Sequence, residues 1–180
     1  MCAETGITSM DADCTPEDTE DSFAAWYRAE YRGLVRTLIV VIGDADVATD
    51  SASEAFVRAL QRWDRVSQMA SPTAWTYTVA LNVARRTFRR ARLEAVVLRR
   101  RSVPPPVRDD SLEVWDAVQH LPLRQRTAVA LHYLSDLSQR DVAAAMGVAE
   151  GTVAATLHDA RRNLAATLGQ PSGKEVMEHG

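Results

Sequence analysis

Hydrophobic positions in residues 137–164 repeat at the spacing of two short amphipathic helices. Ser138 is an N-cap candidate for the first helix, and Gly147 can adopt the positive φ that ends many helices. The expected inward positions are Leu137, Val142, Ala145 and Met146 in the first helix and Val153, Leu157, Ala160 and Leu164 in the second. Two helices joined by a turn of about three or four residues form a helix-turn-helix, whose second helix enters a DNA major groove. The alternative is a helical hairpin buried in an ordinary bundle.

The same period predicts three helices in residues 22–101. The first begins at Ser22 and ends at Gly43, and the third begins at Ser71 and Pro72, where proline takes the first helical position. The expected inward positions are Phe23, Tyr27, Leu34, Leu38 and Ile42 in the first helix, Ala52, Phe56, Leu60 and Trp63 in the second, and Trp75, Val79, Val83 and Phe88 in the third.

Residues 102–110 interrupt the helical pattern with three consecutive prolines, which favour an extended spacer. They separate a domain at 22–101 from a domain at 111–168, whose first two helices would bury Leu112, Trp115, Val118, Leu123, Val129, Ala130, Tyr133 and Leu134. Residues 1–21 and 169–180 lack apolar periodicity, and we expect both to be disordered tails. The predicted fold is therefore all-α, with two small helical domains joined by a Pro-rich linker and a helix-turn-helix in the second.

Charge is distributed unevenly along the chain, although the net charge is only −3. Residues 1–21 carry seven acids and no base, whereas residues 22–101 carry fourteen arginines against seven acids. Within 85–101, eight arginines accompany one acid, Glu94. Such a density of positive charge is the electrostatic pattern of a nucleic-acid-binding face.

An acidic stripe follows from the spacing of Asp46, Asp50 and Glu54 at successive i, i+4 steps. Like charges at this spacing destabilise an isolated helix by roughly a few tenths of a kcal/mol per pair. Solvent exposure accommodates the stripe, and a basic protein partner would explain it better.

Several function classes lack their sequence signals. No apolar run approaches the roughly 20 residues of a membrane span, so we expect a cytoplasmic protein without membrane contact. Cys2 and Cys14 both lie in the acidic tail and form neither a disulfide framework nor a metal site. Because there is no nucleophile–base pair, Gly-rich phosphate loop or metal-ligand spacing, we expect no catalysis, cofactor or metal.

The order of these elements resembles bacterial sigma factors, in particular the small extracytoplasmic-function (ECF) group of the sigma-70 family. The segments that carry the resemblance are DADVATDSASEAFVRALQRWDR (44–65), SPTAWTYTVALNVARRTFRR (71–90) and HLPLRQRTAVALHYLSDLSQRDVAAAMGVAEGTVAATLHDARRNL (120–164). Three segments in this order are far more specific than a lone helix-turn-helix. The resemblance implies a factor that binds core RNA polymerase and directs promoter recognition, DNA melting and transcription initiation, with an anti-sigma factor as a further partner.

The resemblance also implies roles for particular residues. The clamp helices of the large polymerase subunit would contact Asp46, Asp50, Ser53 and Glu54. The melted single strand of the minus-ten element would contact Tyr77, Asn82, Arg85, Arg86, Arg89, Arg90 and Arg92. The minus-thirty-five duplex would contact Glu150, Thr152, Ala155, His158, Arg161 and Arg162. Because Ala154, Thr156 and Asp159 stand where the family commonly has basic residues, we expect few phosphate contacts there and a shallow salt dependence.

Two other functions fit part of the sequence. A stand-alone repressor would use only the helix-turn-helix and bind duplex DNA as a dimer, with half-sites about one helical turn apart. A decoy or adaptor would bind polymerase or a regulator without initiating transcription, because Ser51, Ala52 and Ser53 replace the residues usual in the family next to Asp50.

Overall fold

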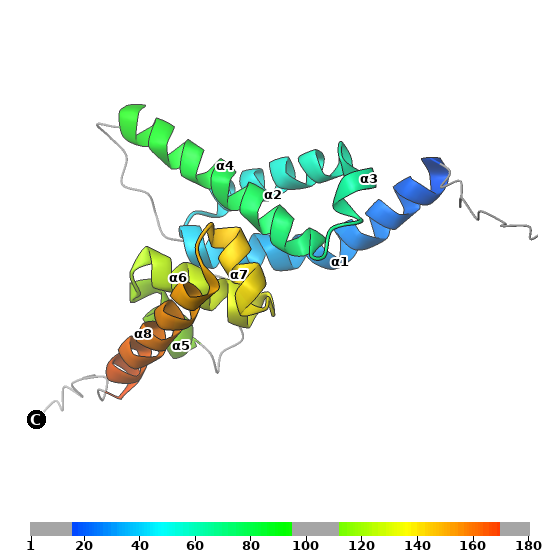
Figure 1. Ribbon diagram of the computed structural model, residues 1–180. Helices are drawn as coiled ribbons and strands as arrows, with labels where there is room; N and C mark the ends of the chain where they lie inside the picture. The colour runs from blue at the N-terminus through cyan, green and yellow to red at the C-terminus, as the bar shows by residue number, and fades with distance from the viewer. Residues whose placement is uncertain (1–15, 95–111, 170–180) are drawn as a thin grey trace, which may run out of the picture.

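The computed structural model describes residues 16–94 and 112–169, and within these ranges every regular element is helical (Figure 1). The first range holds α1 (Pro16–Ile42), α2 (Ala45–Leu60), α3 (Trp63–Val66) and α4 (Pro72–Glu94). The second holds α5 (Leu112–His120), α6 (Leu123–Val129), the π-helical segment η2 (Ala130–Leu134), α7 (Gln139–Met146) and α8 (Glu150–Leu168). The expected all-α fold is confirmed. The expected linker at 102–110 lies outside the described residues.

Helices α1, α2 and α4 pack against one another to form the first unit (Figure 1). The face of α2 that makes this possible carries small side chains at helical spacing: Ala48, Ala52, Ala55 and Ala59, all with no exposed surface. Small side chains at a contact allow helix axes to approach closely. Gly43 ends α1 at φ 74°, and the Asp44 carboxylate then accepts from the Val47 amide at 3.0 Å to cap α2.

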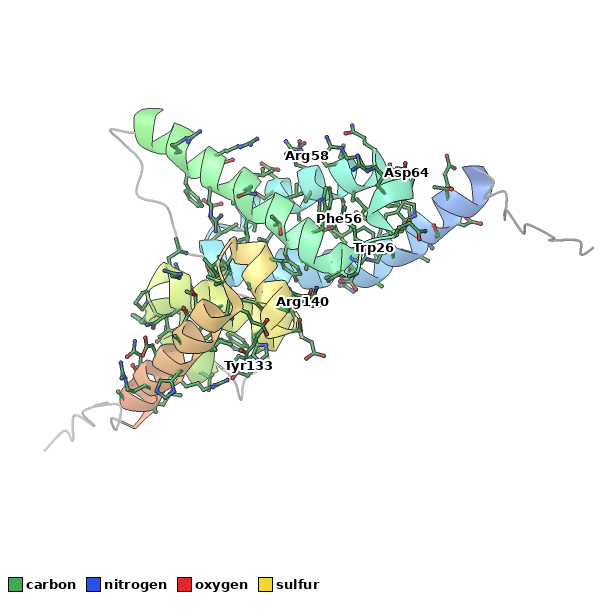
Figure 2. The ribbon with its side chains drawn as sticks, in the orientation of Figure 1. Trp26, Phe56, Arg58, Asp64, Tyr133 and Arg140 are labelled. Atoms are coloured by element: carbon green, nitrogen blue, oxygen red, sulfur yellow. The ribbon has the colours of Figure 1, made fainter. Side chains whose placement is uncertain are left out.

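An aromatic cluster fills the end of this unit where the first part of α1 meets α2 and α3. Trp26 contacts Phe56 and Trp63 with ring centroids 4.9 and 4.8 Å apart (Figure 2). The Trp63 indole donates to Ser22 Oγ at 2.7 Å. Ser22 therefore serves the cluster and is not a helix cap, because α1 begins earlier, at Pro16. The part of the expected disordered tail at 16–21 is helical, which the proline start and nearby acids favour.

The buried face of α4 differs from the predicted one. Side chains at the expected positions Trp75, Val79, Val83 and Phe88 are only half-buried. The fully buried positions are Ala74, Thr76, Tyr77, Ala80, Leu81 and Ala84. Because α4 packs against α2 on one side and α7 on the other, its buried surface is wider than one amphipathic stripe, and its small residues gave no hydrophobic signal.

The helix-turn-helix is confirmed in α7 and α8. The Ser138 hydroxyl accepts from the Asp141 amide at 3.1 Å to cap α7. Gly147 takes the left-handed conformation at φ 68°, and the Val148 amide donates back to the Ala143 carbonyl at 3.0 Å. Of the side chains expected to face inward on these helices, those without exposed surface are Val142, Val153, Leu157 and Ala160.

The two units share a continuous buried core, in which α4 packs on α7 and α1 packs on α6 and η2 (Figure 1). Three buried or half-buried hydroxyls join them. Ser135 Oγ donates to the Tyr77 hydroxyl at 2.6 Å and shares a 2.9 Å hydrogen bond with Thr37 Oγ1. Burial raises the pKa of Tyr77, which keeps the phenol neutral. We call Thr37, Tyr77 and Ser135 the hydroxyl bridge.

The αL turn of the helix-turn-helix gives a first prediction. Gly147→Ala should lower the free energy of unfolding by about 1–2 kcal/mol, because an L side chain is strained at positive φ. Gly151→Ala is the matched control, since Gly151 lies in α8 with open space around a built Cβ. It should raise stability by about 0.4–1 kcal/mol. Chemical denaturation of the full chain measures both, and equal effects of the two substitutions would contradict the turn geometry.

The hydroxyl bridge gives a second prediction. Tyr77→Phe should lower the free energy of unfolding by about 1–3 kcal/mol, because the Ser135 hydroxyl loses its acceptor in a buried setting. Tyr27→Phe is the control, because Tyr27 lies on α1 with 37% of its surface exposed. Urea denaturation should leave this control within about 0.5 kcal/mol of the parent chain. A Tyr77→Phe chain as stable as the parent would show that the bridge contributes nothing.

Candidate functional site

The arginine-rich part of α4 presents a row of guanidinium groups to solvent. Arg85, Arg86 and Arg89 are exposed, as is Asn82. Arg85 Nη1 donates to Asn82 Oδ1 at 3.3 Å, so this amide oxygen has an acceptor role within the protein. The helix continues through Arg90 and Arg92, whose side chains lie outside the described set. We call Asn82, Arg85, Arg86 and Arg89 the basic row; it places three exposed cationic side chains beside one amide.

Tyr77, expected to contact the same DNA strand, lies elsewhere. Its side chain is 2% exposed and belongs to the hydroxyl bridge between the two units. In this packed arrangement its ring is not accessible to a base, and contact of Tyr77 with the minus-ten strand stays a prediction. The periodicity of α4 gave no sign of this burial, because the contact comes from Ser135 in the second unit.

The predicted acidic stripe is exposed on α2. Asp46, Asp50, Ser53 and Glu54 all face solvent, and Glu54 pairs with Arg58 at 2.8 Å. A hollow of about 540 Å³ separates Asp50 and Glu54 from Arg86 and Arg89 of the basic row. Opposite charges therefore face each other across the hollow, which lowers the net potential of this side of the unit.

Two exposed apolar side chains continue the acidic stripe along α2. Val57 and Leu60 are 49% and 50% exposed, although the sequence predicted that Leu60 faces inward. Their spacing from Ser53 and Glu54 places them on the same side of the helix, and this spacing was the signal that could have identified them. Together with Asp46, Asp50, Ser53 and Glu54 they form what we call the α2 face. Apolar groups beside a charged rim are typical of a protein-binding surface.

The recognition helix α8 presents most of its predicted contacts. The exposed positions are Glu150, Ala155, His158, Arg161 and Arg162, and Thr152 is half-buried. Arg162 pairs with Asp159 at 3.2 Å, and Arg161 Nε donates to the Tyr133 hydroxyl at 2.9 Å. Tyr133, expected inward, is instead 54% exposed, and its hydroxyl accepts the hydrogen bond from Arg161 on α8. Sequence reasoning missed Tyr133 as an exposed neighbour of Arg161, one of the predicted contacts on α8.

The described residues hold neither a membrane-crossing helix nor a metal-binding group. No helix in residues 16–94 and 112–169 has the length and apolar character that a membrane crossing needs. Over the same ranges, no three His, Cys, Asp or Glu side chains are arranged to hold a metal ion.

Two family models match the chain over the two structural units. The model described as Sigma-70 region 2 matches residues 19–94, and the one described as Sigma-70, region 4 matches residues 111–164. These matches cover both the basic row and the helix-turn-helix, whereas a stand-alone repressor would need only the helix-turn-helix.

Solved structures support the same fold. The sigma factor RpoE of Bartonella quintana, solved with the anti-sigma factor NepR, matches with a TM-score of 0.70 at 23% identity, over 83% of this chain and 98% of RpoE. CnrH, solved with the cytosolic domain of CnrY, matches with a TM-score of 0.61 at 21% identity, over 83% of this chain and 89% of CnrH.

Sequence relatives identify the family. The RNA polymerase sigma-E factor of Streptomyces avermitilis is 30% identical over 149 residues, which span 79% of this chain and 82% of that protein. The ECF RNA polymerase sigma factor SigL of Mycobacterium tuberculosis is 34% identical over 145 residues, 75% of this chain and 82% of SigL. With both sigma-70 regions matched in order, the chain belongs to the ECF group of RNA polymerase sigma factors, which direct promoter recognition.

Proposed function

We propose that the protein binds core RNA polymerase through the α2 face, captures the melted minus-ten element on α4 and reads the minus-thirty-five duplex with α8. It carries out no catalytic step of its own. The observation that carries the proposal is the basic row, which stands exposed on α4 in a chain that also has a solvent-facing recognition helix.

The basic row suits a single strand of DNA. Arg85 donates to Asn82 Oδ1, so the Asn82 amide nitrogen is left to donate to a base edge. The guanidinium groups of Arg85, Arg86 and Arg89 would bind phosphates, Arg85 through the nitrogens that do not contact Asn82, which adds affinity without sequence preference. Arg90 and Arg92 follow on the same helix and extend the proposed phosphate contacts.

The α2 face suits a basic protein surface. Its carboxylates would steer the encounter with polymerase and fix the register, while Val57 and Leu60 would lose water on contact. Ser53 Oγ lies 3.2 Å from the Tyr31 hydroxyl, so the stripe is also tied to α1.

Helix α8 would read the duplex with few cations. Arg162 is partly neutralised by Asp159, and Arg161 is held against Tyr133. The remaining proposed contacts are Glu150, Thr152, Ala155 and His158. We infer that base-edge contact and DNA shape contribute more here than phosphate charge does.

The packed arrangement must open before both promoter elements are bound. Elements near −10 and −35 are about 25 base pairs apart, or roughly 85 Å along B-DNA. Here α4 contacts α7 and α7 contacts α8, so the two DNA-facing helices lie much closer than that. Residues 95–111, at about 3.5 Å per extended residue, are long enough for the units to separate.

A protein regulator fits this requirement. RpoE was solved with the anti-sigma factor NepR, and CnrH was solved in complex with the cytosolic domain of CnrY. We infer that an anti-sigma factor binds this chain as well and holds the units in an arrangement that cannot engage a promoter.

The basic row gives a third prediction. Arg85→Ala with Arg89→Ala should reduce open-complex formation about tenfold or more and lower the salt slope by about 2, because two phosphate contacts are lost. Binding of core polymerase should not change. The control is Arg28→Ala with Arg32→Ala, an exposed arginine pair at the same i, i+4 spacing on α1. If polymerase binding falls together with open-complex formation, the row faces polymerase and the assignment to DNA is wrong.

The α2 face gives a fourth prediction. Val57→Ser with Leu60→Ser should weaken binding of core polymerase about tenfold or more, because buried apolar contact is lost at the interface. The fold should persist, since both side chains are half exposed in the free protein. Val114→Ser with Leu168→Ser is the control, a Val and Leu pair 43% and 45% exposed in the second unit. Equal affinity of the two double variants, measured by biolayer interferometry, would remove the α2 face from the polymerase interface.

A further inference from the structure

A largely apolar cavity of about 550 Å³ lies where the two units meet. Ile42, Leu81 and Phe88 line it from the first unit, and Leu123, Met146 and Val148 line it from the second. Its size falls within the range of about 300–1,000 Å³ that small-molecule sites occupy, and interfaces between domains are a common place for them. Neither the polymerase nor the DNA contacts proposed above use these apolar side chains.

Every charged residue in the lining of this cavity is an arginine, and Thr127 is the one neutral polar residue among its described lining residues. Arg85, Arg124 and Arg126 line it, and no carboxylate is among its described lining residues. Arg126 Nη1 donates to the Gln119 carbonyl and side-chain oxygens at 2.8 and 3.2 Å, but its Nε is buried and has no hydrogen-bond partner within the described residues. Burial lowers the pKa of Arg126, as expected for a cation that is partly withdrawn from water without an anion beside it.

We propose that this cavity binds a small amphipathic organic anion, such as a medium-chain carboxylate. The apolar body would lie against Leu81, Phe88 and Met146, and the carboxylate would meet the guanidinium groups of Arg124 and Arg126. Guanidinium and carboxylate groups match in geometry and form strong charge-assisted hydrogen bonds. One such ligand would both supply the negative charge that these arginines lack and fill the apolar space.

The acidic N-terminal tail is a poor occupant of the cavity. Residues 1–15 precede α1, whereas Val41 and Ile42, which line the cavity, lie at the opposite end of this 27-residue helix, roughly 40 Å away. A fully extended stretch of this length reaches about 50 Å, so only its first few residues could arrive. Those residues contain a single acid, Glu4.

Ligand binding here would stabilise the packed arrangement. The lining comes from both units, so a ligand loses half its contacts when they separate. A molecule that binds one state and not the other shifts the population toward the state it binds. On the proposed function, the ligand would therefore reduce engagement of polymerase and promoter; the binding step itself does not depend on that function.

Calorimetric titration of the full chain tests the site, with dodecanoate as the probe and dodecanol as its uncharged counterpart. Dodecanoate should bind, and dodecanol should bind about tenfold or more weakly because it lacks the charge. Arg124→Gln should lower the affinity for dodecanoate by a similar factor. Arg140→Gln, which changes an exposed arginine on α7 outside the cavity lining, should leave that affinity unchanged. Ala84→Leu should abolish binding by filling the space, with circular dichroism confirming that the helices persist.

Several outcomes would overturn the proposal. For the ligands, these outcomes are no binding of dodecanoate, or equal binding of dodecanoate and dodecanol. For the variants, they are equal effects of Arg124→Gln and Arg140→Gln, or full dodecanoate affinity in a folded Ala84→Leu chain. A protein partner that crosslinks to a photoreactive residue introduced at position 123, with no dodecanoate binding, would assign the cavity to a protein segment instead.

A transcription assay separates the site from the proposed function. With core polymerase and a promoter fragment, dodecanoate should reduce initiation by the parent chain and leave Ala84→Leu unaffected. Calorimetric binding without this inhibition would mean that the site exists but does not hold the units together, which overturns the regulatory part. Failure of initiation in the absence of dodecanoate would count against the proposed function and not against the site.

Discussion

The hydroxyl bridge between the two units is the contact on which the rest of the arrangement depends. Ser135 meets Thr37 from α1 and Tyr77 from α4, three positions far apart in the sequence. Each such hydrogen bond contributes only about 0.5–1.5 kcal/mol net. The bridge therefore orients the units without making their packing permanent, as the proposed opening requires.

The same packing determines which functional surfaces are available. It buries Tyr77 and a broad face of α4, yet it leaves the basic row, most of the α2 face and most of the predicted contacts on α8 exposed. On the proposed function, polymerase or a single promoter element would be able to bind the packed form. Simultaneous binding of both proposed promoter elements would require the units to separate, because the spacing of the elements exceeds the separation of the helices. Regulation can then act on the packing itself, without covering any of these surfaces.

Local features of the fold could be predicted from the sequence, and contacts between units could not. The Ser138 cap and the Gly147 turn follow from residue chemistry within a few positions, and the structure has both. The positions of Tyr77, Leu60 and Tyr133 depend on partners distant in the chain: Ser135 buries the first, and α8 turns the third outward. Leu60 is exposed because α2 buries an alanine face that carries almost no hydrophobic signal.

Transcription with purified bacterial core polymerase on a fragment library of the host genome tests the central claim most directly. Sequencing of the transcript starts should show clusters at a small set of sites that share spaced promoter motifs and vanish when this protein is omitted. Co-elution with core polymerase without any starts would indicate a decoy. Neither starts nor co-elution would contradict the account.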